Sequence, residues 1–267
     1  MSKNKYEIDM CNGTIMDKLI SFSVPLMLSG ILQLMFNAVD IIVVGRFAGS
    51  QSLAAVGSTT ALINMFVNLF IGVSLGANVL AARFYASGKH KEMSETVHTA
   101  ITFAAISGVV MALIGVLMAK PALELMGTPD DVINLSTLYM RIYFLGMPFF
   151  MLYNYGAAVL RAVGDTKRPL MFLMAAGIIN ACLNMVLVIV FNLGVAGVAI
   201  ATIFSQFISC VLVLRCLNKT DASYQLRFSK LKIKGYYLKQ IFQVGIPAGI
   251  QSTVINFSNA LLQSSVN

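Results

Sequence analysis

An aspartate inside a long apolar segment is the residue of this chain best suited to chemistry. Asp40 lies in the apolar segment 20–45, and of the eleven acidic residues it is the only one placed well inside such a run. A carboxylate at membrane depth is costly, so it faces a bundle interior or a water-filled cavity. With amide and hydroxyl oxygens around it, it can bind a proton or a hard cation such as Na⁺. Asp40 is therefore the first candidate for a functional site.

Amide side chains recur at helical spacing near this aspartate. Residues four and seven apart share one face of a helix, so the first apolar segment has a polar stripe and the next segment has a similar one. These amides either bind a substrate or hydrogen-bond neighbouring helices together. The two stripes contain Ser29, Gln33, Asn37 and Asp40 in the first segment, and Thr60, Asn64 and Asn68 in the second.

A third pair of amides, Asn180 and Asn184, lies at a matching depth in a later segment. If the two helices end near residues 45 and 191, Asp40 lies roughly 7 Å and Asn184 roughly 10 Å below the outer surface. They are expected to share one pocket. Arg141 is the basic residue that could reach Asp40, and it either forms that ion pair or extends outward to the interface.

The composition is that of a polytopic membrane protein. Hydrophobic residues make up 58% of the chain and charged residues only 11%, whereas soluble domains are about 45–50% apolar and about 25% charged. The net charge of +8 does not indicate nucleic-acid binding, because sixteen of the nineteen Lys and Arg residues fall in four alternating segments. The positive-inside rule then predicts a cytoplasmic N-terminus.

The apolar segments predict an all-α fold, a six-helix transmembrane bundle followed by the first helix of a repeated second bundle. Pro25 lies inside the first span, and Lys120-Pro121 is expected to end the third. The expected spans are 20–45, 53–80, 97–119, 132–160, 169–191 and 194–215, with a seventh apolar segment from about 241.

The seventh segment is similar to the first, which indicates an internal parallel repeat. Aligning Pro247 with Pro25 places Asn259-Ala260 opposite Asn37-Ala38, and Leu262 opposite Asp40. Chance matching between two apolar helices is the alternative. The repeat predicts an N-terminal lobe at 1–217, a basic cytoplasmic linker at 218–239, and the first helix of a truncated second lobe at 240–267.

Enzyme and metal-site patterns are absent from the sequence. The four cysteines form no CxxC or Cys/His cluster, His90 lies in a loop, and His98 lies at the cytoplasmic end of a span. An active site needs a reactive group held by a partner, and no such pair occurs. We therefore expect neither an enzyme nor a resident metal or cofactor.

Three motifs carry a resemblance to a known family. They are Val39-Asp40 followed by Gly45-Arg46, then Ser52-Leu53-Ala54-Ala55-Val56-Gly57, and the loop Leu160-Arg161-Ala162-Val163-Gly164-Asp165-Thr166-Lys167-Arg168-Pro169. With these motifs the chain resembles the multidrug and toxic compound extrusion (MATE) family along nearly all its length.

The resemblance implies twelve helices in two six-helix lobes that export cationic compounds in exchange for H⁺ or Na⁺. It maps an ion-coupling aspartate onto Asp40, with Asn180 and Asn184 beside it. Many members carry an acid at the second of these positions, so the neutral Asn184 is a departure that favours protons. The resemblance also suggests a tyrosine, Tyr139 or Tyr143, and Thr202 around the pocket, and a helix bend at Pro25.

The predicted function is thus a secondary multidrug antiporter in the plasma membrane, a monomer when full length, with membrane lipid around it. Gln33, Asn37, Asn64 and Asn68 are its predicted contacts to organic cations, and H⁺ or Na⁺ is its coupling ion. The alternative within the same superfamily is a flippase for a lipid-linked saccharide. Such a flippase would place several cations in its cavity to hold a diphosphate, and only Arg141 lies at membrane depth. A membrane-embedded enzyme or scaffold is the third possibility, for which no catalytic pair is present.

Overall fold

The structure is a computed structural model that describes residues 6, 8 and 14–266, with side chains up to residue 254. Within these residues every regular element is a helix, as predicted. The elements are α1 (Ile15–Val43), η1 (Val44–Ala48), α2 (Ser50–Ala86), α3 (His90–Leu125), α4 (Ile133–Leu145), α5 (Met147–Ala162), α6 (Lys167–Met185), η2 (Val186–Val190), α7 (Gly194–Lys219), η3 (Phe228–Lys230) and α8 (Gly235–Val266).

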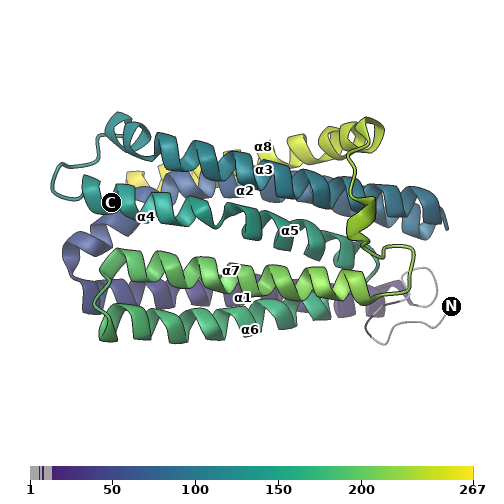
Figure 1. Ribbon diagram of the computed structural model, residues 1–267, viewed down its shortest axis with the longest axis horizontal. Coiled ribbons are helices and arrows are strands. Elements are labelled where there is room, and N and C mark those ends of the chain that lie inside the picture. Colours follow the sequence, from purple (N-terminus) through teal and green to yellow (C-terminus); the bar gives the residue numbers. More distant parts are fainter. Residues whose placement is uncertain (1–5, 7, 9–13, 267) are drawn as a thin grey trace.

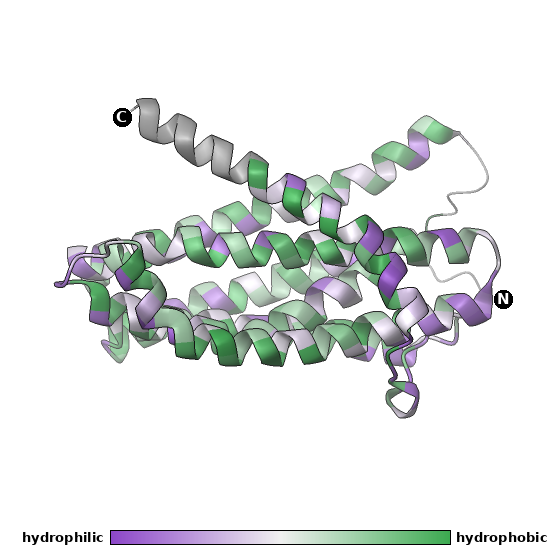
Figure 2. Ribbon diagram, turned by 90° about the horizontal axis from the view of Figure 1, so that it is seen from above, coloured by the Kyte–Doolittle hydropathy of each residue, from purple (hydrophilic) through white to green (hydrophobic). Residues whose placement is uncertain are grey.

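The helices have the length and composition of membrane spans. Among the described residues five helices are long and apolar enough to cross a bilayer, or six if α4 and α5 are counted as one bent span. Hydrophobic residues dominate the middle of the helices, and hydrophilic residues gather mainly at their ends and in the connections (Figure 2). The predicted bundle of apolar helices is thus confirmed.

The helices form two groups joined by α4 and α5. In Figure 1, α1, α6 and α7 run together along one side of the bundle, and α2, α3 and α8 run along the other. The bent pair connects them, because α5 packs on α2, α3 and α7, and α4 packs on the same three helices. α8 packs mainly along α2 and more lightly on α3.

Several details of the spans differ from the sequence prediction. His90, expected in a loop, begins α3, and α8 begins at Gly235, inside the expected linker 218–239. Pro121 does not end the third span, since α3 continues to Leu125. Pro121 lies four residues before the end of α3 and removes only one backbone donor. The helix ends instead ahead of Gly127, whose φ of 70° is in the left-handed region.

The fourth span is broken rather than continuous, because α4 and α5 meet at Gly146 with a bend of 46°. Pro148 follows directly in the first turn of α5. A Cβ added at Gly108 of α3 would lie 2.6 Å from the Pro148 Cα. The glycine therefore lets the bent backbone approach α3 closely.

Glycines also set the crossing of α2 and α8. A Cβ at Gly76 would lie 2.1 Å from the Ile241 carbonyl oxygen, and one at Gly72 would lie 2.1 Å from the Gly249 Cα. On α8, a Cβ at Gly245 would lie 2.6 Å from the Val73 Cα. Each helix thus contributes a pair of glycines four residues apart, a spacing that lets membrane helices approach closely.

Gly76→Ala tests this crossing. The added methyl group has only backbone to displace, so the substitution is expected to destabilise the protein by about 1–3 kcal/mol. Gly57→Ala on the same helix is the matched control, because nothing lies within 4 Å of a Cβ there. It should retain the helix-propensity gain of up to about 1 kcal/mol. Equal thermal unfolding midpoints for the two purified variants would contradict the close crossing.

Candidate functional site

A cavity of about 200 Å³ lies inside the bundle and contains Asp40. It is lined from α1, α2, α4, α5, α6 and α7, so it collects residues that are far apart in the sequence. Its polar lining residues are Gln33, Asn37, Asp40, Asn64, Tyr139, Tyr143, Tyr153, Asn154, Asn180, Thr202, Ser205, Gln206 and Ser209.

Asp40 is held by a chain of hydrogen bonds that joins three helices. Asn184 Nδ2 donates to Asp40 Oδ1 and also to Asn180 Oδ1, the latter over 3.1 Å. Asn180 Nδ2 in turn donates to Thr202 Oγ1 over 3.5 Å. The spacing of four residues puts both asparagines on one face of α6, with Asp40 of α1 at one end and Thr202 of α7 at the other. Asp40 and Asn184, which lie at similar depths in their helices, are thus in direct contact, although Asn184 itself does not line the cavity.

Only the nitrogen of the Asn184 side-chain amide forms hydrogen bonds among the described residues. Its side chain is fully buried, and its Oδ1 has no hydrogen-bond partner among the described residues. An unpaired buried acceptor of this kind is costly. A neutral amide beside a carboxylate can donate its N–H to the ionised form, and after rotation it can accept the O–H of the protonated form.

Aromatic rings form another part of the cavity wall. Both Tyr139 and Tyr143 line it, and their ring centroids are 6.2 Å apart. Phe36 also lines the cavity and packs against Gly177, where a Cβ would lie 1.9 Å from the ring. Aromatic faces attract cations electrostatically, so this wall suits a positively charged ligand.

The predicted substrate contacts divide into two groups. Gln33, Asn37 and Asn64 line the cavity, whereas Asn68 does not. Asn68 lies one turn further along α2, where it is half-buried. Ser29, at the start of the predicted stripe, donates instead to the carbonyl of Pro25 over 2.8 Å. That contact stays within α1, which is continuous through Pro25.

Apart from Thr202, the polar residues on the α5–α7 side of the cavity were not predicted. Asn154 on α5 lines it, as do Ser205, Gln206 and Ser209 on α7. The α7 residues follow Thr202 at spacings of three, four and seven, which place them on one helical face. This periodicity was present in the sequence and could have extended the predicted stripe.

Charge in the cavity is confined to the aspartate. Arg141 is exposed, and its Nε donates to the Val116 carbonyl over 3.2 Å, so it extends outward instead of pairing with Asp40. Within the described residues, Asp40 is the only charged side chain that lines the cavity. The same residues contain no group of three His, Cys, Asp or Glu side chains arranged to hold a metal ion.

The described cysteines do not line this cavity. Cys182, Cys210 and Cys216 are free thiols, whereas Cys11 lies outside the described residues. The side chains of Asn259 and Leu262, which define the repeat alignment, also lie outside them.

The sequence and the fold are both similar to those of known proteins. The MatE family model matches residues 25–186, more than half of the chain. The chain is 34% identical over 255 residues to the probable multidrug resistance protein YoeA of Bacillus subtilis (strain 168), a match that covers 92% of this chain and 55% of YoeA. It is 28% identical over 260 residues to the probable multidrug resistance protein YpnP of the same organism, covering 97% of this chain and 58% of YpnP.

The fold matches a solved structure of a multidrug resistance MATE family transporter of the MOP superfamily in its outward-facing conformation. The TM-score is 0.90 at 22% identity, covering 98% of this chain and 58% of that one. The chain thus spans little more than half the length of the relatives it matches. The match to the MatE model over most of the bundle places this multi-pass membrane protein in the MATE family.

Proposed function

We propose that this chain forms one lobe, and the first helix of the next, of a secondary antiporter that exports organic cations. Asp40 carries the coupling ion, and the cavity around it takes the cation. The observation that supports this most is the setting of Asp40, the only charged lining residue in the described cavity, facing amides and aromatic rings. The multidrug-resistance names of YoeA and YpnP support the substrate class.

The hydrogen bonds around Asp40 favour a proton over Na⁺. A sodium site needs several oxygen atoms directed at the ion. Here the amide of Asn184 directs its N–H to Asp40, and the amide of Asn180 directs its N–H to Thr202. The group that faces Asp40 is therefore an N–H donor, which an ionised carboxylate requires, and not an oxygen atom that could bind Na⁺. Protonation at Asp40 is therefore the coupling reaction that we propose.

Coupling then follows from charge. An ionised Asp40 attracts an organic cation lodged against Tyr139 and Tyr143, and protonation removes that attraction. The cation and the proton therefore lower each other's affinity, by a reciprocal factor of typically about 5–150-fold. High proton activity outside would release the cation there, and loss of the proton inside would reset the lobe.

The lining also supports this function over the flippase alternative. Recognition of a diphosphate calls for arginine or lysine side chains in the cavity, and the charged side chain found there is acidic. We further propose that the lobe lies in the plasma membrane with its N-terminus in the cytoplasm. The positive residues at that end of the bundle support this orientation.

Asp40→Asn tests the coupling role. The substitution preserves size and can still accept from Asn184, but it cannot exchange a proton. In cells that express the complete transporter, resistance to ethidium-like cations is expected to fall to the empty-vector level, with protein abundance unchanged. Asp131→Asn, in an exposed loop, is the matched control and should export normally. Normal export by Asp40→Asn would show that the coupling role is wrong.

Asn184→Asp tests the choice of ion. A second carboxylate beside Asp40 concentrates negative charge and oxygen ligands, which favours a bound cation. At constant pH, transport by the wild type should not depend on Na⁺, whereas transport by the variant should increase with Na⁺. Transport by the wild type that requires Na⁺ at constant pH would contradict proton coupling.

A further inference from the structure

The connection between α7 and α8, residues 220–234, is an ordered strap. Tyr224 and Leu226 are fully buried. Asn218 Nδ2 donates to the Leu226 carbonyl over 2.9 Å, and the Leu226 N–H donates to the Leu217 carbonyl over 3.0 Å. The ring of Tyr224 also meets that of Tyr85 at the end of α2, with centroids 6.4 Å apart. The first half of the strap is thus packed against the bundle.

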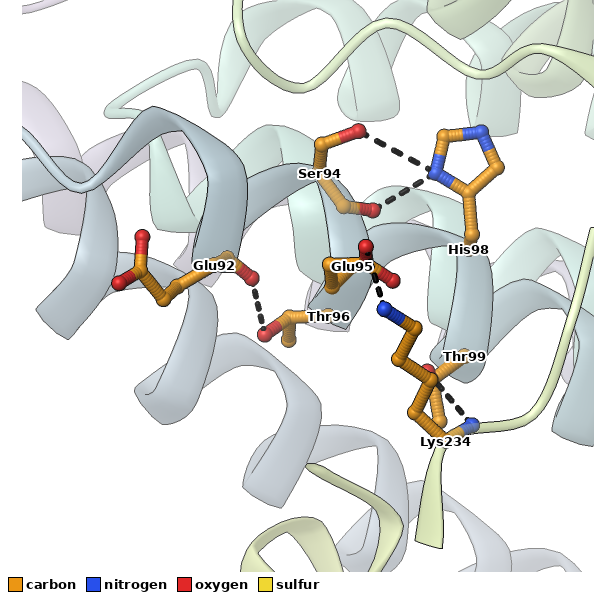
Figure 3. Close-up of polar contacts among 7 residues, drawn as sticks. All are labelled: Glu92, Ser94, Glu95, Thr96, His98, Thr99 and Lys234. Atoms are coloured by element: carbon orange, nitrogen blue, oxygen red, sulfur yellow. Dashed lines mark hydrogen bonds and ion pairs between the residues drawn. The ribbon is translucent and has the colours of Figure 1, made fainter. Parts of the chain in front are cut away.

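The second half of the strap is fastened to α3. The Arg227 N–H donates to His98 Nε2 over 3.1 Å. Figure 3 shows the other end of the attachment, where the Lys234 N–H donates to Thr99 Oγ1 over 3.3 Å and Lys234 Nζ pairs with Glu95 over 2.6 Å. The residues between these two attachments, 228–233, are therefore held in a fixed place on the flank of α3.

That place is at the edge of the apolar part of the bundle. His98 lies eight residues after His90, where α3 begins, so the strap crosses α3 about 12 Å from its start. Figure 1 shows α2 and α3 continuing past the strap at the end of the molecule where the N-terminus lies. The strap consequently lies level with the ends of the membrane spans, while the α2–α3 connection projects beyond it.

The held turn presents apolar and cationic side chains together. The exposed fraction of Phe228 is 57% and that of Leu231 is 39%. Lys230 and Lys232 are exposed between and beside them, and neither forms an ion pair within the described residues. Asp221 is the only acidic residue of the strap. The described residues of the bundle leave more than half of the Phe228 side chain uncovered.

We propose that this turn binds anionic phospholipid at the cytoplasmic membrane surface. Phe228 and Leu231 enter the boundary between headgroups and acyl chains, and Lys230 and Lys232 contact the phosphate groups. Aromatic and aliphatic side chains flanked by lysines bind such a surface through burial and charge together. The strap thereby anchors the connection between α7 and α8 to the cytoplasmic leaflet.

The 267 residues contain no tryptophan. In the complete transporter, with any tryptophan outside these residues replaced by phenylalanine, Phe228→Trp therefore gives a single fluorescent reporter at the turn. The variant is placed in nanodiscs of phosphatidylcholine with increasing phosphatidylglycerol. The acyl chains of both lipids are brominated, so that either lipid quenches a nearby indole. Emission is expected to shift to the blue and to be quenched as phosphatidylglycerol increases. Adding Lys230→Gln should raise the phosphatidylglycerol fraction that gives half-maximal quenching about five-fold.

Two control variants define the emission expected for a lipid-exposed and for a water-exposed tryptophan. Leu117→Trp, on a strongly exposed position of α3, should be quenched equally in both lipids, which also shows that the protein is folded and inserted. His90→Trp, at the exposed start of α3, should remain red and unquenched. Three outcomes for Phe228→Trp would each overturn the proposal. The first is emission like that of His90→Trp, and the second is equal quenching in both lipids. The third is a blue shift without quenching by lipid, which would mean that protein covers the turn.

Discussion

A carboxylate inside a membrane bundle must be given hydrogen-bond partners, and much of the cavity follows from that requirement. Asp40 finds its partner in Asn184, which is tied through Asn180 to Thr202. The chain of contacts draws together α1, α6 and α7, which are distant in sequence. It also leaves the carboxylate facing a polar and aromatic space without a counter-cation among the described lining residues. Such a carboxylate is suited to change its charge.

The sequence predicted the fold and the centre of this site through two simple signals. Apolar length indicated the spans, and the similar helix depths of Asp40 and Asn184 indicated that these two residues could meet, as their hydrogen bond shows. The bend between α4 and α5 was not predicted, because it depends on Gly108 of another helix admitting Pro148. The further polar lining residues of α5 and α7 were missed, because hydroxyl and amide side chains in apolar helices usually only hydrogen-bond neighbouring helices. They include Asn154, Ser205, Gln206 and Ser209.

The connection to α8 was predicted only as a basic linker, because the sequence does not reveal the long-range contacts that order it. Its lysines are visible in the sequence, but its order depends on contacts between Arg227 and His98 and between Lys234 and Glu95. The α2–α8 crossing is similar, since glycine pairs are recognisable but their partners are not. The strap and this crossing together fix the start of α8 against α2 and α3. The N-terminal bundle therefore already positions α8, the first helix of the expected second lobe.

Proton exchange at Asp40 can be measured directly by counting protons when an organic cation binds. Titrating the purified complete transporter with tetraphenylphosphonium, by calorimetry in buffers of different ionisation enthalpy, gives the number of protons released per cation. Coupling through Asp40 predicts release on the order of one proton at a pH where the carboxyl is protonated, and none from Asp40→Asn. Binding by the wild type without proton release at any pH, or equal release by the variant, would contradict it.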